Sequence, residues 1–244
     1  GAEVVLLPWR ETSVTEVAAR LAEFEAAVIA TATDMRLPLI AACAAMNVPF
    51  YCEKPLGYRL DDLAAIAAAA APVAERSMVG FMMRYHAAFR ALAAADLSDA
   101  FRFSLVIGHD VTQWRANWRF SESYAARAEG GGVLLDLCHE IDMAACLFPG
   151  LELRSVESLG HPAYPGVDMS SLLTLASPQG AVGTVAMDYL CPRLVRQTRI
   201  DGVGASHDFD YAAVSYRTIL ASGVNTGLHP QDRNDMFLDA MRDF

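Results

Sequence analysis

The chain has 244 residues, of which 54% are hydrophobic and 20% charged, and its formal net charge is −10 at neutral pH. A hydrophobic content this high supports a folded core and excludes a disordered chain. The negative charge argues against nucleic acids and anionic membrane surfaces as partners, because both require a basic face. The composition therefore predicts a globular protein that binds neither nucleic acid nor membrane.

The five cysteines are odd in number and include no C-x-x-C pair. This pattern argues against a disulfide framework or a zinc knuckle and favours a reducing compartment. Cys138 and Cys146 fall in apolar helical patterns and are predicted to be small buried side chains. The longest apolar run, residues 63–73, is too short to span a bilayer, and no signal peptide precedes the first predicted strand. We therefore expect a cytoplasmic protein.

The first half of the chain alternates short apolar runs with segments of helical spacing. The predicted strands are residues 4–7, 27–30, 49–52 and 78–82, and the predicted helices are residues 14–24, 38–46 and 61–71. Asp34 is a candidate cap for the second helix. Strands and helices that alternate at this spacing predict a parallel, doubly wound α/β sheet of the Rossmann type.

The second half is rich in strands. Predicted strands cover residues 101–107, 153–159, 172–176, 181–188, 199–201 and 208–211, and one long helix covers residues 133–148. Residues 177–180 and 202–204 have typical turn sequences. We therefore predict an α+β domain with a mainly antiparallel sheet, and we divide the chain into domains 1–85 and 86–244.

Glu53, Lys54 and Pro55 come directly after the third predicted strand. Ligands of open α/β sheets bind at the carboxyl ends of the strands. A lysine at that edge can donate a hydrogen bond to a substrate hydroxyl or shuttle its proton. The alternative is a solvated loop pair without a chemical role.

Three glycines, residues 130–132, lead into a segment with two faces. An apolar stripe carries Leu134, Leu137, Ile141 and Ala144, and the other face carries Asp136, His139, Glu140 and Met143. An acid and an imidazole on one helix face suit general acid–base catalysis, and the glycines would let a chain or ligand approach closely. One alternative is a surface helix with ordinary polar residues. Another is a metal site formed by Asp136, His139, Glu140 and Asp142, for which no convincing further ligand is found, so we predict no metal.

The order of these features resembles the glucose–fructose oxidoreductase, inositol dehydrogenase and rhizopine-catabolism oxidoreductase family. The resemblance rests on Glu-Lys-Pro after a strand, on residues 80–85, and on three glycines followed by D-x-x-H-x-x-D. It covers nearly the whole chain. It implies a Rossmann domain for NAD(P), then a domain for substrate binding and oligomerisation, and hydride transfer to or from a sugar, polyol or sugar derivative. A homodimer or homotetramer is expected.

The resemblance also implies roles for individual residues. Lys54 matches the family lysine near the nicotinamide and the substrate hydroxyl. His139 matches the histidine that exchanges the proton during hydride transfer, and Asp136 is expected to orient it. The expected cofactor-binding residues are Arg10, Thr31, Ala32, Thr33, Glu53, Lys54, Pro55 and Arg84.

Four features depart from the family pattern. No G-x-G-x-x-G precedes residue 4, so the chain is expected to begin near the second strand of a longer Rossmann fold. Leu135 replaces the aspartate that is usual four residues before the histidine, and Asp136 is three before it. Arg36 stands where histidine is common, and Met82 lies near a usual asparagine. A non-catalytic sensor or scaffold with this fold is therefore the alternative function, and a metal-dependent lyase or epimerase is a more distant one.

Arg10 bears on the choice of cofactor. An arginine after the first predicted strand favours the 2′-phosphate of NADP, whereas an acid there would favour NAD. The sequence therefore leans slightly toward NADP. A predicted loop suited to sugar stacking or anion binding, or else to packing for stability, carries Trp114, Arg115, Trp118 and Arg119. His86, beside the fourth strand, is a weaker candidate.

Overall fold

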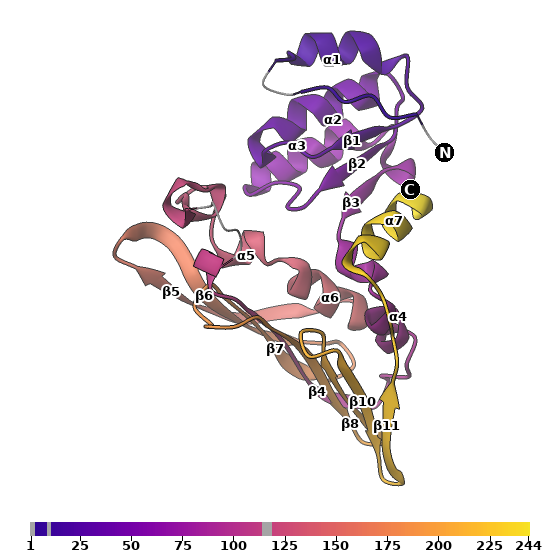
Figure 1. Cartoon of the computed structure of the whole chain (residues 1–244), viewed down its shortest axis with the longest axis vertical. Helices are drawn as coiled ribbons and strands as arrows, with labels where there is room; N and C mark the ends of the chain where they lie inside the picture. The colour runs from indigo at the N-terminus through magenta and orange to yellow at the C-terminus, as the bar shows by residue number, and fades with distance from the viewer. Residues whose placement is uncertain (1–2, 9–10, 114–118) are drawn as a thin grey trace. The chain divides into compact units, whose positions relative to one another are not determined.

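The computed structural model describes residues 3–8, 11–113 and 119–244, and the chain divides into two compact units (Figure 1). The first unit comprises residues 1–81 and 240–244, and the second comprises residues 82–239. The predicted domains, 1–85 and 86–244, differ from these units at residues 82–85 and 240–244. The assignment of one domain to the cofactor, and of the other to substrate and oligomer contacts, stays a prediction.

The first unit is a three-stranded parallel sheet with packed helices. Its strands are β1 (Ala27–Ile29), β2 (Phe50–Glu53) and β3 (Met78–Gly80), paired in the order β1-β2-β3. Its helices are α1 (Val14–Leu21), α2 (Arg36–Ala45) and α3 (Leu60–Ala70), with 3-10 turns η1 (Thr33–Met35) and η2 (Ala74–Arg76). Strand and helix side chains, among them Ile29, Ile40 and Cys52, meet in one core. The predicted parallel sheet is confirmed.

Two helix starts in this unit differ in their capping. At α1, the Ser13 hydroxyl accepts a hydrogen bond from the Glu16 backbone N–H, and the Glu16 carboxylate accepts one from the Ser13 N–H. This reciprocal pair satisfies two backbone donors that the helix leaves open. At α2 the predicted cap is wrong, because Asp34 lies inside η1 and Met35 occupies the cap position without a side-chain hydrogen bond.

The predicted strand at residues 4–7 is also wrong. Residues 3–8 adopt no regular secondary structure, and Val4 and Leu6 are each 84% exposed. A strand obtains its backbone hydrogen bonds from a neighbouring strand. Among the described residues β1 pairs with β2 alone, so this apolar run has no partner there.

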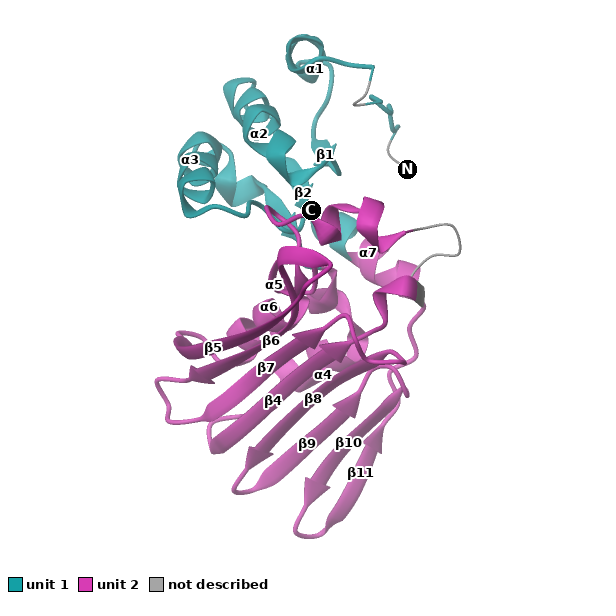
Figure 2. Cartoon of the chain, turned by 90° about the vertical axis from the view of Figure 1, so that its left-hand side faces the viewer, with its two compact units in different colours: residues 1–81, 240–244 teal, residues 82–239 magenta. Residues whose placement is uncertain are grey.

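The second unit is built on an eight-stranded sheet, whose strands Figure 2 shows side by side. The strands are β4 (Ala100–Gly108), β5 (Glu152–His161), β6 (Tyr164–Ala176), β7 (Val182–Asp188), β8 (Val195–Gly202), β9 (Ala205–Asp210), β10 (Ser215–Leu220) and β11 (Gly223–Gly227). Their order is β11-β10-β9-β8-β4-β7-β6-β5, and only the β4–β7 pair is parallel. The mainly antiparallel sheet is confirmed. Strands β10 and β11 were not predicted.

Helices pack on one face of this sheet. They are α4 (Ala87–Ala93), α5 (Val133–Asp136) and α6 (His139–Leu147), and α7 (Arg233–Asp243) ends the chain. The unit also has 3-10 turns η3 (Met82–Tyr85), η4 (Val111–Gln113), η5 (Phe120–Glu122) and η6 (Tyr124–Ala126). Helix α5 packs on β6 and β7, and α6 packs on β4 and β7. The Phe103 ring of β4 stacks on Phe148, which follows α6, with ring centroids 4.5 Å apart.

The predicted single helix over residues 133–148 is wrong, because two helices occupy this segment. Helix α5 ends at Asp136, and Leu137 has φ −100° and ψ 24°, outside the helical range. Helix α6 then begins at His139. His139 is therefore the first residue of a new helix instead of the seventh of a long one.

All five cysteines carry free thiols. Cys43 and Cys52 are buried, and burial raises the pKa of each thiol to about 11. Cys138 and Cys146 are half-buried, less than predicted. In the described part of the chain no helix has the length and apolar character needed to cross a membrane.

Candidate active site

The predicted cofactor residues of the first unit lie together at one edge of its sheet. Residues 31–33 follow β1, and residues 53–55 end β2 and continue from it. Strands β1 and β2 are parallel, with Ile29 opposite Cys52, so both segments leave the sheet at its carboxyl edge. That edge is where open α/β sheets bind their ligands.

Arg36 joins these two segments. Its side chain is buried, and its Nη2 donates hydrogen bonds to the backbone oxygens of Thr31 (3.3 Å) and Lys54 (3.4 Å). A guanidinium can hold two carbonyls at once because its donors form a rigid fork. The arginine that departs from the family pattern therefore fixes the spacing of the two segments that carry the predicted site.

Lys54 is the only lysine among the 19 lysine and arginine residues of the chain. Arginine stays protonated in proteins, whereas a lysine ammonium can release its proton and is more compact. A chain that uses arginine at every other basic position indicates a requirement at residue 54 that arginine does not meet. This residue count is a signal in the sequence that is independent of the strand-end argument.

The neighbours of Lys54 are also constrained. The Lys54–Pro55 peptide bond is cis. The Tyr51 hydroxyl donates to Glu53 Oε1 at 3.5 Å, and Tyr51 lies against Gly80 of β3. A Cβ at Gly80 would stand 2.5 Å from the Tyr51 hydroxyl, so only glycine leaves room for this ring.

The polar residues of α5 and α6 are buried. Asp136, His139, Glu140 and Asp142 are 6%, 7%, 1% and 9% exposed. This excludes the surface-helix alternative, because such groups enter a protein interior only when they are hydrogen-bonded or have a function. The site residues therefore divide between the units: residues 31–33 and 53–55 in the first, and Arg84, Asp136 and His139 in the second.

Two of these buried carboxylates are held by arginines. Glu140 accepts hydrogen bonds from Arg196 Nε (2.6 Å) and Nη2 (3.3 Å). Asp142 accepts from Arg84 Nε (2.8 Å) and Nη2 (2.5 Å). Both carboxylates are occupied by guanidiniums, which removes two of the four candidate metal ligands. Arg84, predicted to bind the cofactor, is half-exposed and is bound bidentately to Asp142.

Asp136 is held by two phenols. Its Oδ1 accepts from the Tyr124 hydroxyl at 2.7 Å, and its Oδ2 accepts from the Tyr189 hydroxyl at 3.0 Å. Tyr189 follows β7 and is 2% exposed. Neither tyrosine was predicted, because the contacts join residues 12 and 53 positions from Asp136 and leave no local pattern.

The glycines before α5 admit the protein's own chain. A Cβ at Gly131 would lie 2.4 Å from the Arg127 carbonyl oxygen. Gly132 has φ +84°, and a Cβ there would lie 1.7 Å from Asp168 Oδ1. Asp168 Oδ2 in turn accepts from the Leu134 backbone N–H at 2.9 Å, so this β6 carboxylate caps the start of α5.

Substitution of Gly132 by alanine is expected to cost about 3 kcal/mol or more of unfolding free energy, since it adds left-handed backbone strain and displaces the Asp168 cap. Gly180 is the matched control, because its φ is +100° and a Cβ there meets nothing within 4 Å. Urea denaturation of both variants measures their unfolding free energies. The loss in Gly180→Ala reports backbone strain alone, and the additional loss in Gly132→Ala reports the displaced Asp168 contact. Equal losses in Gly132→Ala and Gly180→Ala would contradict the role given to the Asp168 contact.

Other predicted residues contribute less or are not described. Arg10, Trp114, Arg115 and Trp118 lie outside the described residues. Arg119 is exposed and pairs with exposed Glu122 at 3.5 Å. His86 is the N-cap of α4, where its Nδ1 accepts a hydrogen bond from the Ala88 N–H. Burial, with Arg196 and His229, lowers the pKa of His86. His86 therefore has a structural role as a helix cap.

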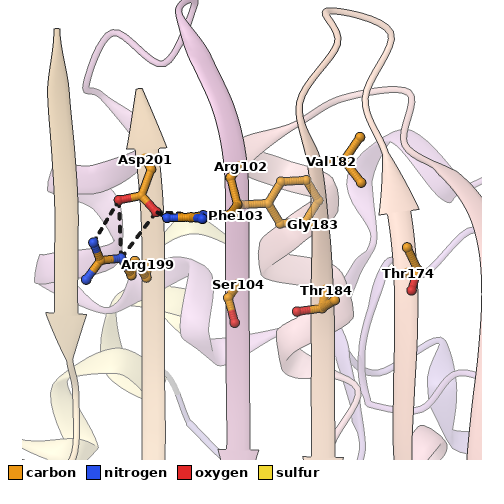
Figure 3. Close-up of a pocket in the computed structure, with 9 residues that line it drawn as sticks. All are labelled: Arg102, Phe103, Ser104, Thr174, Val182, Gly183, Thr184, Arg199 and Asp201. Carbon is orange, nitrogen blue, oxygen red and sulfur yellow. Dashed lines mark hydrogen bonds and ion pairs between the residues drawn. The ribbon is translucent and has the colours of Figure 1, made fainter. Parts of the chain in front are cut away.

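A separate depression of about 310 Å³ lies on the eight-stranded sheet and contains none of the predicted site residues (Figure 3). Arg102 and Arg199 both bind the Asp201 carboxylate there, with Nη2–Oδ distances of 2.7 and 3.0 Å. Ser104, Thr174 and Thr184, which carry hydroxyls, line the depression together with Phe103, Val182 and Gly183. Arg102 of β4 thereby joins its strand to Asp201 of β8, whereas Arg199 holds the same carboxylate from within β8.

The pKa of Asp201 is lowered to about 2, chiefly by its hydrogen bond from Arg199, with Arg102 adding to the effect. Because this pKa lies below the unfolded value of about 3.9, its stabilisation is present above pH 4 and is lost as the pH falls toward 2. We expect wild type to lose about 1 kcal/mol more unfolding free energy than Asp201→Asn over that range, a small value because both guanidiniums are largely exposed. Parallel stability curves from pH 5 to 2 would contradict this.

The fold and this geometry define a two-part protein of one class: a parallel Rossmann-type sheet with a lysine at its carboxyl edge, then a mostly antiparallel sheet covered by helices on one face. The chain belongs to the GFO/IDH/MocA family, since the model of the family's C-terminal domain matches residues 85–210, more than half of the chain. No curated protein sequence matches the chain.

Solved structures share this fold. An oxidoreductase from Agrobacterium radiobacter in complex with NAD+, L-tartaric acid and magnesium is 18% identical over 88% of this chain, with a TM-score of 0.73. This chain spans 64% of the length of that protein, less than two thirds. Levoglucosan dehydrogenase with NADH and levoglucosan is 20% identical over 91% of this chain and 71% of its own, with a TM-score of 0.74. UDP-N-acetylglucosamine 3-dehydrogenase from Acidithiobacillus ferrooxidans is 18% identical over 93% of this chain and 72% of its own length, with a TM-score of 0.74. At these identities the likeness concerns the fold.

Proposed function

We propose that the protein is an NAD(P)-dependent oxidoreductase that transfers hydride between a nicotinamide cofactor and a hydroxyl or carbonyl carbon of a sugar, polyol or sugar derivative. One observation carries this proposal: the only lysine of the chain stands at the carboxyl end of β2, beside the loop that follows β1. Family membership and the NAD(H) complexes of similar structures support it.

The cofactor would be held at the carboxyl edge of the first unit. Residues 31–33 and 53–55 offer backbone groups and two threonine hydroxyls there, and Arg36 fixes their spacing. This edge fits a dinucleotide, which binds across the ends of parallel strands. When bound, the nicotinamide supplies the hydride acceptor or donor. Arg84 and Arg10 complete the proposed set, and the lean toward NADP rests on Arg10 alone.

In the oxidation direction, the substrate hydroxyl loses its proton while the carbinol hydrogen leaves as hydride. Lys54 is proposed to donate a hydrogen bond to the hydroxyl oxygen and stabilise the negative charge that develops on it. His139 is proposed to accept the proton, since imidazole is the usual general base near neutral pH. Asp136 orients and stabilises the imidazolium that results. In reduction, His139 returns the proton to the carbonyl oxygen.

Labelling of Lys54 tests this function directly. We expect an amine-reactive reagent such as trinitrobenzenesulfonate to modify Lys54 in the full-length protein, as read by peptide mass mapping. Saturating NADH or NADPH should protect this residue at least tenfold, and the more protective cofactor identifies the preference. Lys54→Arg is the control for background labelling. A lack of protection, together with a lack of NAD(P)H binding by fluorescence, would favour the sensor or scaffold alternative.

We also propose a homodimer or homotetramer formed through the sheet face that the helices leave uncovered. That face presents partly exposed apolar side chains, including Leu159 (59%) and Leu172 (42%), beside short hydroxyl side chains. Exposed apolar surface of this kind is typical of association sites. Sedimentation velocity of the full-length protein checks the mass, and a monomer at 50 μM or so would contradict this proposal.

A further inference from the structure

Asp136 differs from the other buried carboxylates of α5 and α6 in the partners that hold it. Glu140 and Asp142 are bound by arginines, which cancel their charge. Asp136 is bound by two neutral phenols, one on each carboxylate oxygen. Neutral donors stabilise a carboxylate without removing its negative charge. The two hydroxyls therefore fix both oxygens of the Asp136 carboxylate without cancelling its charge.

The two phenols come from different parts of the unit. Tyr189 is 2% exposed, and its ring packs against Phe120 of η5 with centroids 5.4 Å apart. Burial, together with the Asp136 charge, raises the pKa of Tyr189 well above its usual range, so this phenol stays a donor. Tyr124 belongs to η6 and is 54% exposed. One donor is thus built into the core, and the other reaches the carboxylate from the surface.

His139 lies three residues after Asp136, across the break between α5 and α6. Consecutive Cα atoms are about 3.8 Å apart, so the two Cα atoms are separated by no more than about 11 Å. Both side chains are buried, and charges interact over such distances when water is excluded. The charge on Asp136 therefore bears on the protonation of His139.

The other described carboxylates on these helices, and Asp168 of β6 beside them, have partners on other elements. Arg196 of β8 faces Glu140, and Arg84 of η3 faces Asp142. Asp168 of β6 accepts from the Leu134 N–H, and its Oδ2 also accepts from the Ser171 hydroxyl at 3.2 Å. Each of these carboxylates has a hydrogen-bond partner on another element, and the two phenols are the side chains that hold the Asp136 carboxylate, three residues before His139.

We propose that Tyr124 and Tyr189 are positioning residues for proton transfer: each holds one oxygen of Asp136, and together they set the place and effective charge of this carboxylate beside His139. This inference rests on the proposed function for its catalytic meaning. The arrangement itself concerns only residues of the second unit.

Titration of the His139 ring by NMR in the full-length protein tests the inference without any substrate. The chain has six histidines, and the His139 signal is assigned by its loss in His139→Asn. Tyr124→Phe and Tyr189→Phe are each expected to raise the pKa of His139 by roughly 0.5–1 unit, because a less stabilised carboxylate favours the imidazolium. Asp136→Asn is expected to lower that pKa, since it removes the charge.

Tyr164→Phe is the matched control, because the Tyr164 ring packs on the same Phe120 at 4.8 Å while its hydroxyl is not one of the two phenols on Asp136. It is expected to leave the His139 titration unchanged. Far-UV circular dichroism shows which variants remain folded, and Tyr124→Phe, at an exposed ring, keeps the test valid if Tyr189→Phe unfolds. Unshifted titration in Tyr124→Phe, or an equal shift in Tyr164→Phe, overturns the proposal.

The pH profile of kcat/KM links the arrangement to turnover. In Tyr124→Phe, the apparent pKa in the pH profile of kcat/KM should shift by the same amount as the His139 pKa measured by NMR, and this agreement supports the positioning role. An NMR shift without any such change in an active enzyme overturns it. Absence of hydride transfer in wild type would contradict the proposed function alone, and the NMR titration would still decide whether the two phenols tune His139.

Discussion

Replacement of Lys54 by methionine is expected to lower kcat/KM for sugar or polyol oxidation by about 10²–10³-fold, the range lost when one donor to a developing negative charge on oxygen is removed. Methionine replaces the unbranched apolar stem of lysine and lacks the terminal ammonium. The Lys54 backbone oxygen still accepts from Arg36, so the edge of the sheet is expected to persist. Initial rates in the full-length protein, with NADH affinity measured by fluorescence, separate chemistry from binding.

Lys54→Arg sharpens this experiment. The chain carries arginine at each of its other lysine or arginine positions, so the variant introduces a residue type that this protein already uses throughout. The variant retains the positive charge but has a planar, permanently protonated group. We expect a loss of at least tenfold relative to wild type. Activity close to wild type in Lys54→Arg would mean that a positive charge is sufficient, and Lys54→Met at wild-type activity would remove this residue from the mechanism.

Substitution of Arg196 by methionine is expected to lower the unfolding free energy by about 3–5 kcal/mol, since it leaves a buried carboxylate without its partner. Glu140 is 1% exposed and receives two hydrogen bonds from Arg196. Arg196 Nη1 also contacts the sulfur of Met83 in η3, so the substitution also removes a packing contact between β8 and η3. Guanidinium denaturation followed by circular dichroism measures the change.

The double variant Arg196→Met with Glu140→Met removes both charges and is the matched test. Replacement of a buried ion pair by apolar side chains of similar size is often neutral or stabilising. We therefore expect the double variant to recover most of the stability that Arg196→Met loses. A double variant as unstable as the single one would show that shape at this position, and not the unpaired charge, sets the cost.

Several elements follow from the sequence by general rules. Short apolar runs separated by helical segments predicted β1, β2 and β3 and their parallel pairing, because a crossover helix returns the chain to the same end of the sheet. The rule that ligands bind at the carboxyl ends of parallel strands predicted a role for residues 53–55, whereas residues 31–33 were expected to bind the cofactor from the family resemblance. The strands predicted at residues 101–107 and 181–188 likewise correspond to β4 and β7.

Other features depend on distant parts of the chain and left no local signal. The apolar run at residues 4–7 has the composition of a strand but no neighbour to pair with among the described residues. The predicted helix over residues 133–148 is interrupted at Leu137, directly after Asp136, whose carboxylate binds the phenols of Tyr124 and Tyr189. Asp168 of β6 caps the start of the same segment. These contacts cross 12 to 53 residues of sequence.

The sequence by itself determined the alternation of strand and helix from β1 to β3, the two kinds of sheet, and the position of the single lysine at a strand end, because periodicity and residue type act over a few neighbouring residues. The tertiary structure alone decided that the polar residues of α5 and α6 are buried, and which partner holds each one. It also decided that Arg36 ties Thr31 to Lys54. A buried charge is stable only with a partner, and partners are brought together by packing, not by spacing along the chain.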